Sequence, residues 1–290
     1  MWGAFNPRFL IKGDQMRLTT NQINSFNTFG YLLFPKLFTD DIEKITDEFE
    51  SMWTEVDHDQ SKRSMRIPFI DENEYLSALL DDPRIEQTIG SLLGDNFNYT
   101  ASDGNLYAGE TDWHSDGYFR HPGYTSIKIA FYLDTVTKDN GCLRVIPGSH
   151  KPGDSYADGL QSVLDARTMD KQSMTQATGK LTENSWHMSG PQVPSVPLQS
   201  NPGDMVMFDH RLKHSSFGGG GRRRMFTMNF EHRYMGRDQV MLRDEFQINL
   251  KFGLKQPYGD VMLNTASPSR MVHLEQRLSN IHYMKELLEE

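Results

Sequence analysis

Two residues that can bind a metal lie close together in the segment Trp113-His-Ser-Asp116. His114 and Asp116 are two residues apart, so on a β-strand their side chains point to the same side. A candidate third ligand is His214, at the end of Phe208-Asp-His-Arg-Leu-Lys-His214, and His210 in that segment is an alternative. Two histidines and one carboxylate on one face of a metal ion leave the opposite positions open, as in non-haem Fe(II) oxygenases. On its own, such a pair is more often a hydrogen-bonded polar pair at a strand end.

The composition indicates a globular protein whose partner is not a nucleic acid. The chain has 290 residues, of which 37% are hydrophobic and 24% charged, so it can bury a full core. Its net charge of −9 argues against a nucleic-acid partner, because such a surface must be basic. The single cysteine, Cys142, suits a reducing compartment. No apolar run is long enough to cross a membrane and the first residues lack a signal-peptide pattern, so we expect a cytoplasmic protein without a membrane partner.

Helices and one strand are expected before the first motif. Thr19, Thr39 and Asp82 are typical N-cap residues, and we expect a helix after each of them. The second of these helices has an apolar stripe at helical spacing up to about residue 56, which indicates packing against a large surface. The third begins with Asp82-Pro83 and ends at Gly94. The segment 29–34 has the pattern of a strand.

From about residue 97 the pattern changes to short β-like runs separated by Gly, Pro, Asn and Asp. The expected strands lie at 97–101, 104–108, 125–134, 142–146, 204–209 and 223–232. Many short strands without alternating helices predict a sandwich or a jelly roll. The predicted fold class is therefore mainly β with flanking helices, with the N-terminal helices packed on one sheet.

The rest of the chain is predicted to decorate this β core, which would span about 97–235. Residues from about 151 to 203 are polar and have the pattern of a lid-like insertion, with one helix around 157–167. An amphipathic pattern from Ser269 to about 289 predicts one C-terminal helix. No internal repeat is visible, so we expect residues 1–290 to form a single domain.

Two strands allow their inner and outer faces to be distinguished. In 126–134 and in 223–231, one face is aliphatic or aromatic and the other carries polar groups. If helices cover one side of the sheet, the apolar faces lie under them and the mixed faces line the barrel. The residues expected inside are Lys128, Tyr132, Arg223, Thr227 and Asn229.

Further motifs follow the metal-ligand candidates in a definite order. After Trp113-His-Ser-Asp116 come Asn140-Gly-Cys-Leu-Arg-Val-Ile-Pro-Gly-Ser-His150, Pro202-Gly-Asp-Met-Val-Met-Phe-Asp209, His214 and Arg223. This order, over roughly residues 20–235, resembles the phytanoyl-CoA dioxygenase family. The resemblance implies an Fe(II)- and 2-oxoglutarate-dependent oxygenase on a double-stranded β-helix, a cupin-like jelly roll.

The resemblance also implies roles for individual residues. His114, Asp116 and His214 would be the iron ligands, and Arg223 would hold the distal carboxylate of 2-oxoglutarate. Arg223 is preferred to its two arginine neighbours because strand parity places those on the outward face.

Other positions on the inner face are assigned more loosely. Lys128, Tyr132 and Thr227 are assigned to the binding of 2-oxoglutarate or substrate. Lys128 has an alternative as the partner of Asp134 or another acid. Family members often carry tryptophan at the position aligned with Ala130, and the smaller side chain here opens space beside the iron.

The reaction implied by the resemblance is hydroxylation of a C–H bond in a small molecule, with consumption of O2 and 2-oxoglutarate and release of succinate and CO2. Asp116 supports hydroxylation, because related halogenases have a small residue in place of this carboxylate. Desaturation and ring formation remain alternatives, as do a metal-dependent isomerase or hydrolase on the same fold and a non-enzymatic ligand-binding jelly roll. The sequence identifies neither the substrate nor the oligomeric state.

Overall fold

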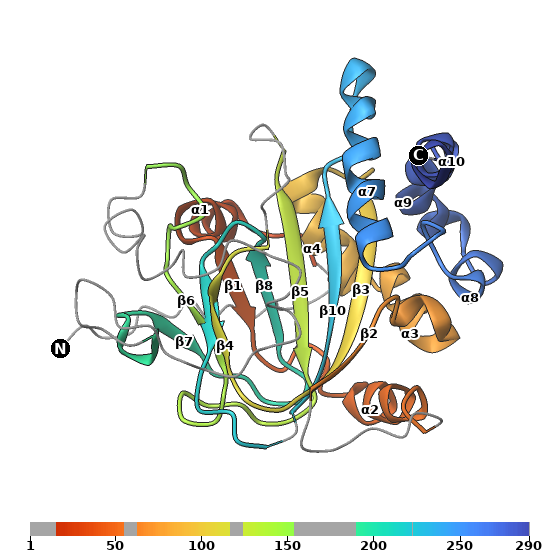
Figure 1. The fold of residues 1–290 in the computed structure, drawn as a ribbon. Coiled ribbons are helices and arrows are strands. Elements are labelled where there is room, and N and C mark those ends of the chain that lie inside the picture. Colours follow the sequence, from red (N-terminus) through yellow and green to blue (C-terminus); the bar gives the residue numbers. More distant parts are fainter. Residues whose placement is uncertain (1–15, 55–62, 117–123, 154–189, 222, 290) are drawn as a thin grey trace.

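The computed structural model describes residues 16–54, 63–116, 124–153, 190–221 and 223–289. These residues form two antiparallel sheets and a set of helices (Figure 1). Apolar side chains from both sheets share one buried cluster, so the sheets pack face to face. Neighbouring strands are often distant in sequence, which gives the jelly-roll topology of a double-stranded β-helix. The predicted fold class is confirmed.

The larger sheet has the strand order β1-β8-β5-β10-β3-β2, and the smaller sheet has the order β4-β9-β6-β7. The strands of the larger sheet are β1 (Tyr31–Phe34), β2 (Ser64–Arg66), β3 (Asn98–Tyr107), β5 (Ser126–Tyr132), β8 (Met205–Asp209) and β10 (Arg223–Glu231). Those of the smaller sheet are β4 (Thr111–His114), β6 (Leu143–Val145), β7 (Val196–Leu198) and β9 (His214–Ser216).

Helices from both ends of the chain pack on the outer face of the larger sheet (Figure 1). The α-helices are α1 (Thr20–Phe29), α2 (Ile42–Ser51), α3 (Glu74–Ala78), α4 (Pro83–Leu93), α7 (Leu242–Lys251), α8 (Asp260–Asn264), α9 (Pro268–Ser279) and α10 (His282–Glu289). Short 3-10 helices are η1 (Ile70–Glu72), η2 (Leu79–Asp81), η3 (Gly190–Gln192) and η4 (Gly236–Met241). None of the helices in these described segments is both long and apolar enough to cross a membrane.

The two faces of the larger sheet have different roles, as strand parity predicts. Phe131 of β5 and Phe226 of β10 are fully buried in the core that the helices cover, and their stacked rings have centroids 4.9 Å apart. The alternate residues of the same strands, including Tyr132 and Arg223, line a cavity on the inner side. Alternation along each strand therefore separates a structural face from a cavity-lining face.

Two of the three predicted helix starts are confirmed. Thr19 forms a capping box with Gln22, and the side chain of Asp82 accepts a hydrogen bond from the backbone N–H of Arg84 before Pro83 opens α4. Thr39 is wrong as an N-cap. Its hydroxyl donates to the carbonyl of Lys36, and α2 begins only at Ile42.

The predicted strands at 97–101 and 104–108 are one strand, so this prediction is wrong. β3 continues through Gly104 and pairs with β10 along its length. A Cβ atom at Gly104 would collide with the ring of Phe69, which lies against the strand. The glycine therefore marks a close approach within the strand and not its end.

The single predicted C-terminal helix is also wrong. α9 ends at Ser279, and a turn at Asn280 and Ile281 separates it from α10. Leu274 of α9 is buried in the main core, whereas Leu288 of α10 is 49% exposed. α7 and α8 were not predicted. The assignment of residues 1–290 to one domain stays a prediction.

Only part of the predicted insertion at 151–203 can be described. The helix expected at 157–167 lies outside the described residues. Residues 196–198 form β7, which pairs with β6, so this end of the segment belongs to the smaller sheet.

Candidate metal centre and its cavity

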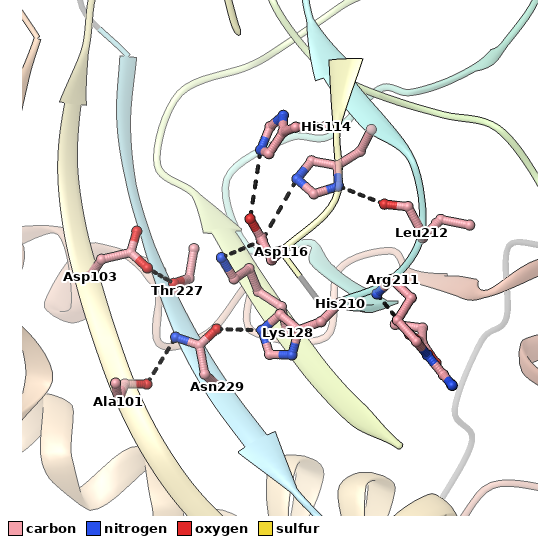
Figure 2. A network of polar contacts seen from close by, with 12 residues as sticks. Ala101, Asp103, His114, Asp116, Lys128, His210, Arg211, Leu212, Thr227 and Asn229 are labelled. Carbon is pink, nitrogen blue, oxygen red and sulfur yellow. Dashed lines mark hydrogen bonds and ion pairs between the residues drawn. The ribbon is translucent and has the colours of Figure 1, made fainter. Parts of the chain in front are cut away.

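The three predicted metal ligands lie together at one end of the smaller sheet. β4 and β9 pair antiparallel, and their register places His114 directly opposite His214. Asp116 follows β4, and its backbone N–H donates to the carbonyl of His210 at 2.7 Å. One nitrogen or oxygen from each of the three side chains lies within 4.8 Å of the others (Figure 2).

Backbone carbonyls fix the orientation of both imidazole rings. Nδ1 of His114 is 2.8 Å from the carbonyl of Asp112, and Nδ1 of His214 is 2.8 Å from the carbonyl of Leu212. A carbonyl only accepts hydrogen bonds, so Nδ1 carries the proton and Nε2 keeps its lone pair. The two Nε2 atoms lie 3.6 and 3.7 Å from the Asp116 oxygens. This donor set suits a divalent metal.

The charge states of the three side chains also suit a metal ion. Burial lowers the pKa of His114, and it lowers the pKa of His214 to about 3, so both rings are neutral near pH 7. Burial raises the pKa of Asp116, but the neighbouring ammonium of Lys128 and the nearby imidazole rings together outweigh this effect, so the pKa lies well below its usual value and the carboxyl is ionised. Two neutral imidazoles and one carboxylate are the forms that bind metal.

Lys128, predicted to face the cavity, contacts Asp116 directly. Its Nζ donates to Oδ2 of Asp116 at 2.7 Å (Figure 2). The alternative partner Asp134 instead binds Arg224, with a closest distance of 2.5 Å. Burial lowers the pKa of Lys128, and the negative charges of Asp116 and Asp103 reverse that shift. Lys128 is therefore a charged residue beside the candidate ligands.

A cavity of about 250 Å³ lies beside the three ligand candidates. Its polar lining includes His114, Asp116, His214, Lys128, Tyr132, Ser216, Arg223, Thr227, Asp103 and Asn105. Its apolar lining includes Met65, Ile67, Ala130, Leu143, Phe208, Met225 and Phe252. All seven predicted site residues therefore surround one space, and their functional roles stay predictions.

Arg223 is 7% exposed and is held by neutral oxygens. Nη1 donates to Ser216 Oγ at 2.6 Å and to the carbonyl of Gly141, and Nη2 donates to the carbonyl of Gly109 at 2.8 Å. Burial lowers the pKa of its guanidinium group. Among the described residues no carboxylate forms an ion pair with Arg223, and its buried Nε has no hydrogen-bond partner. The site thus presents an uncompensated cation to the cavity, which suits an anionic ligand.

Glycine is required at the point where the side chain of Arg223 packs against the loop that follows β5. Gly141 has a φ of +94°, and a Cβ atom there would collide with the guanidinium group. Ser216, two residues after His214 on β9, shares its face and reaches the same arginine. Strand parity could have identified Ser216 from the sequence.

The neighbouring arginines differ from Arg223 as far as the structure describes them. Arg224 faces outward, where it contacts Glu50 at 3.0 Å as well as Asp134. Arg222 lies outside the described residues. His210, the alternative ligand, directs Nε2 to the amide oxygen of Asn229 at 2.8 Å (Figure 2).

A family model described as phytanoyl-CoA dioxygenase (PhyH) matches residues 26–225. The chain belongs to the phytanoyl-CoA dioxygenase family. The predicted resemblance is thereby confirmed over most of the chain, and the matched region ends within β10.

Curated relatives that carry the name ectoine dioxygenase match part of the chain. The protein from Bordetella bronchiseptica is 26% identical over 154 residues, which cover 46% of this chain and 50% of the relative. The protein from Sphingopyxis alaskensis is 27% identical over 165 residues, covering 51% and 50%. The chain thus spans about half the length of the curated relatives that it matches.

Solved structures share the fold at low sequence identity. EctD from S. alaskensis, crystallised with 2-oxoglutarate and 5-hydroxyectoine, has a TM-score of 0.52 at 19% identity, with 77% of this chain and 78% of that chain covered. The carbocyclase SnoK from nogalamycin biosynthesis has a TM-score of 0.54 at 15% identity, with 74% and 84% covered. These similarities support the jelly-roll fold of the family.

Sequence reasoning missed several residues of the cavity. Asp103, Asn105 and Tyr107 alternate on the inner face of β3, but the presumed break before Gly104 concealed this pattern. Phe252 reaches the cavity from the end of α7, which was not predicted.

Proposed function

We propose that this protein is an Fe(II)- and 2-oxoglutarate-dependent dioxygenase that hydroxylates a C–H bond of a small molecule. One observation carries the proposal: a cluster of two histidines and one carboxylate lines the same cavity as a buried arginine. Among the described residues, this arginine has no acidic partner. Membership of the phytanoyl-CoA dioxygenase family supports the same reaction class.

His114, Asp116 and His214 would hold the metal from one side. The two carbonyl-bound Nδ1–H groups keep each Nε2 available as a ligand, and Lys128 holds the Asp116 carboxylate in place. When bound, Fe(II) with O2 and 2-oxoglutarate supplies the oxidant that converts a C–H bond to C–OH, while 2-oxoglutarate is converted to succinate and CO2.

Arg223 would bind the distal carboxylate of 2-oxoglutarate. A guanidinium group has five N–H donors, and the protein engages three of them, leaving one on Nε and one on Nη2. Burial strengthens the attraction between this cation and a carboxylate. A hydrolase or isomerase on this fold has no evident use for such a buried anchor, and a binding protein has no evident use for the assembled metal ligands.

An anaerobic titration tests the proposal. Adding Fe(II) and then 2-oxoglutarate to the metal-free protein is expected to produce a weak visible charge-transfer band that saturates at one equivalent of each. The His114→Ala variant, which lacks one ligand, should not develop the band. A wild-type protein that binds Fe(II) but develops no band with 2-oxoglutarate would contradict the proposal.

A further inference from the structure

Asp103 lies in a part of the cavity away from the proposed cosubstrate anchor. In the register of β10 with β3, Arg223 is opposite Tyr107, and Thr227 is opposite Asp103. Four residues along a strand correspond to about 13 Å. Asp103 therefore belongs to the region that remains for the substrate, if 2-oxoglutarate occupies the end at Arg223 as proposed above.

Two neutral donors hold the Asp103 carboxylate in place. The hydroxyl of Thr227 donates to Oδ1 (Figure 2). Nδ2 of Asn105 donates to Oδ2 at 2.5 Å. Thr227 was predicted to bind cofactor, and its contact here is with this carboxylate. No lysine, arginine or histidine of the described segments forms an ion pair with Asp103. Each carboxylate oxygen keeps a further lone pair for another donor.

The nearby cations have other contacts. Lys128 is close enough for the charge of Asp103 to raise its pKa, but its Nζ is hydrogen-bonded to Asp116. The exposed Arg63 lies over the ring of Tyr107, 4.1 Å from the centroid, and its Nη2 is 3.5 Å from Asn105 Oδ1. Within the part of the chain that the structure describes, neither Arg223 of β10 nor Asp103 of β3 forms an ion pair. The register of the two strands separates the cation and the carboxylate by about four residues.

We propose that Asp103 binds a protonated amine or guanidinium group of the substrate. This inference rests on the proposed function, because it assigns Arg223 and its surroundings to 2-oxoglutarate. Met65 and Phe252 line the same cavity and are 38% and 40% exposed, so they offer apolar surface at its edge. They are placed to contact the hydrocarbon part of the ligand, so the substrate class is a small aliphatic amine or guanidine.

Binding of simple cations tests this inference. The probes are n-butylamine and n-butylguanidine, with 1-pentanol as a neutral molecule of similar size. Their dissociation constants are measured by ligand-observed NMR on the protein loaded with Zn(II) and 2-oxoglutarate. At least one cation should bind more tightly than pentanol, and Asp103→Asn should weaken it about tenfold or more, because a charge-assisted hydrogen bond is lost.

Two further variants serve as controls. Glu110→Gln removes the same charge from another carboxylate that lines the cavity, and the affinity for the cations should stay within about twofold of wild type. Asp103→Ser provides a second test if Asp103→Asn does not fold. Equal binding of cations and pentanol to the wild-type protein, or equal binding of cations to the wild type and an Asp103 variant, would overturn the inference. Cation binding can be measured without iron, so a missing charge-transfer band would reject the proposed function separately.

Discussion

The ammonium group of Lys128 lies 2.7 Å from Oδ2 of Asp116, one of the three candidate metal ligands. Both side chains face the cavity, on β5 and just after β4. The contact occupies one carboxylate oxygen and limits rotation of the group. It also makes the largest contribution among the neighbouring groups that keep Asp116 ionised despite burial.

Lys128→Met is expected to lower the rate of succinate release about 10- to 100-fold, because loss of a residue that orients a metal ligand typically has an effect of this size. Lys128→Arg should recover part of the rate, since arginine can donate to the same oxygen. Lys138→Met, at an exposed position, is the matched control and should behave like wild type. A Lys128→Met enzyme with the wild-type rate would show that Asp116 needs no such support.

His114→Ala and His214→Ala are each expected to reduce succinate release to less than about one-hundredth of wild type, because a ligand is removed outright. Bound iron, measured by elemental analysis after gel filtration, should fall in parallel. His282→Ala, at an exposed position on α10, is the control. Undiminished succinate formation by His114→Ala would show that His114 is not a metal ligand.

Gly141→Ala is expected to raise the KM for 2-oxoglutarate about tenfold or more, because the new methyl group would displace the guanidinium group of Arg223. Arg223→Met should have an effect in the same direction and at least as large. Gly220→Ala is a matched control, since a Cβ there meets no atom of the described residues within 4 Å. If Gly141→Ala resembled Gly220→Ala, Arg223 could not be the anchor that the proposal requires.

His273 should make stability depend on pH. It is 1% exposed, its ring stacks on Phe97 with centroids 3.8 Å apart, and its Nδ1 is 3.0 Å from the Phe97 carbonyl. Burial lowers its pKa, and the Phe97 carbonyl and the nearby Glu86 oppose this shift only in part. As the pH falls below about 6.5, the unfolded chain binds the proton first, so the free energy of unfolding decreases by up to about 1.4 kcal/mol per pH unit.

Urea unfolding at pH 8 and pH 5.5 measures this contribution. The wild-type protein should lose more stability between the two values than His273→Gln, which removes the titrating group. His282→Gln should lose as much as wild type. Equal losses for wild type and His273→Gln would assign the pH dependence to other groups.

The inner face of the sheet was predictable because it depends on local alternation. Lys128, Tyr132, Arg223 and Thr227 follow from period two along their own strands, and each lines the cavity. The partner of Lys128 was less predictable, because Asp116 and Asp134 are both acidic and only the packing of the two sheets decides between them.

The missed residues depend on contacts between distant segments. The sequence around Gly104 does not reveal that the ring of Phe69 lies against β3, so the glycine was interpreted as a break and Asp103 was missed. Phe252 enters the cavity from α7, which follows the part of the chain that the family model matches. Such contacts are set by tertiary packing, which periodicity does not encode.

The pairing of His114 with His214 across β4 and β9 has a consequence for folding. A metal ion bound by both would act as a removable cross-link between positions about 100 residues apart. The cross-link would close the intervening loop and so reduce the conformational entropy of the unfolded chain. The two short strands that carry these histidines would then be fastened by the ion as well as by their backbone hydrogen bonds. Metal supply would control how firmly the smaller sheet is closed, in addition to controlling catalysis.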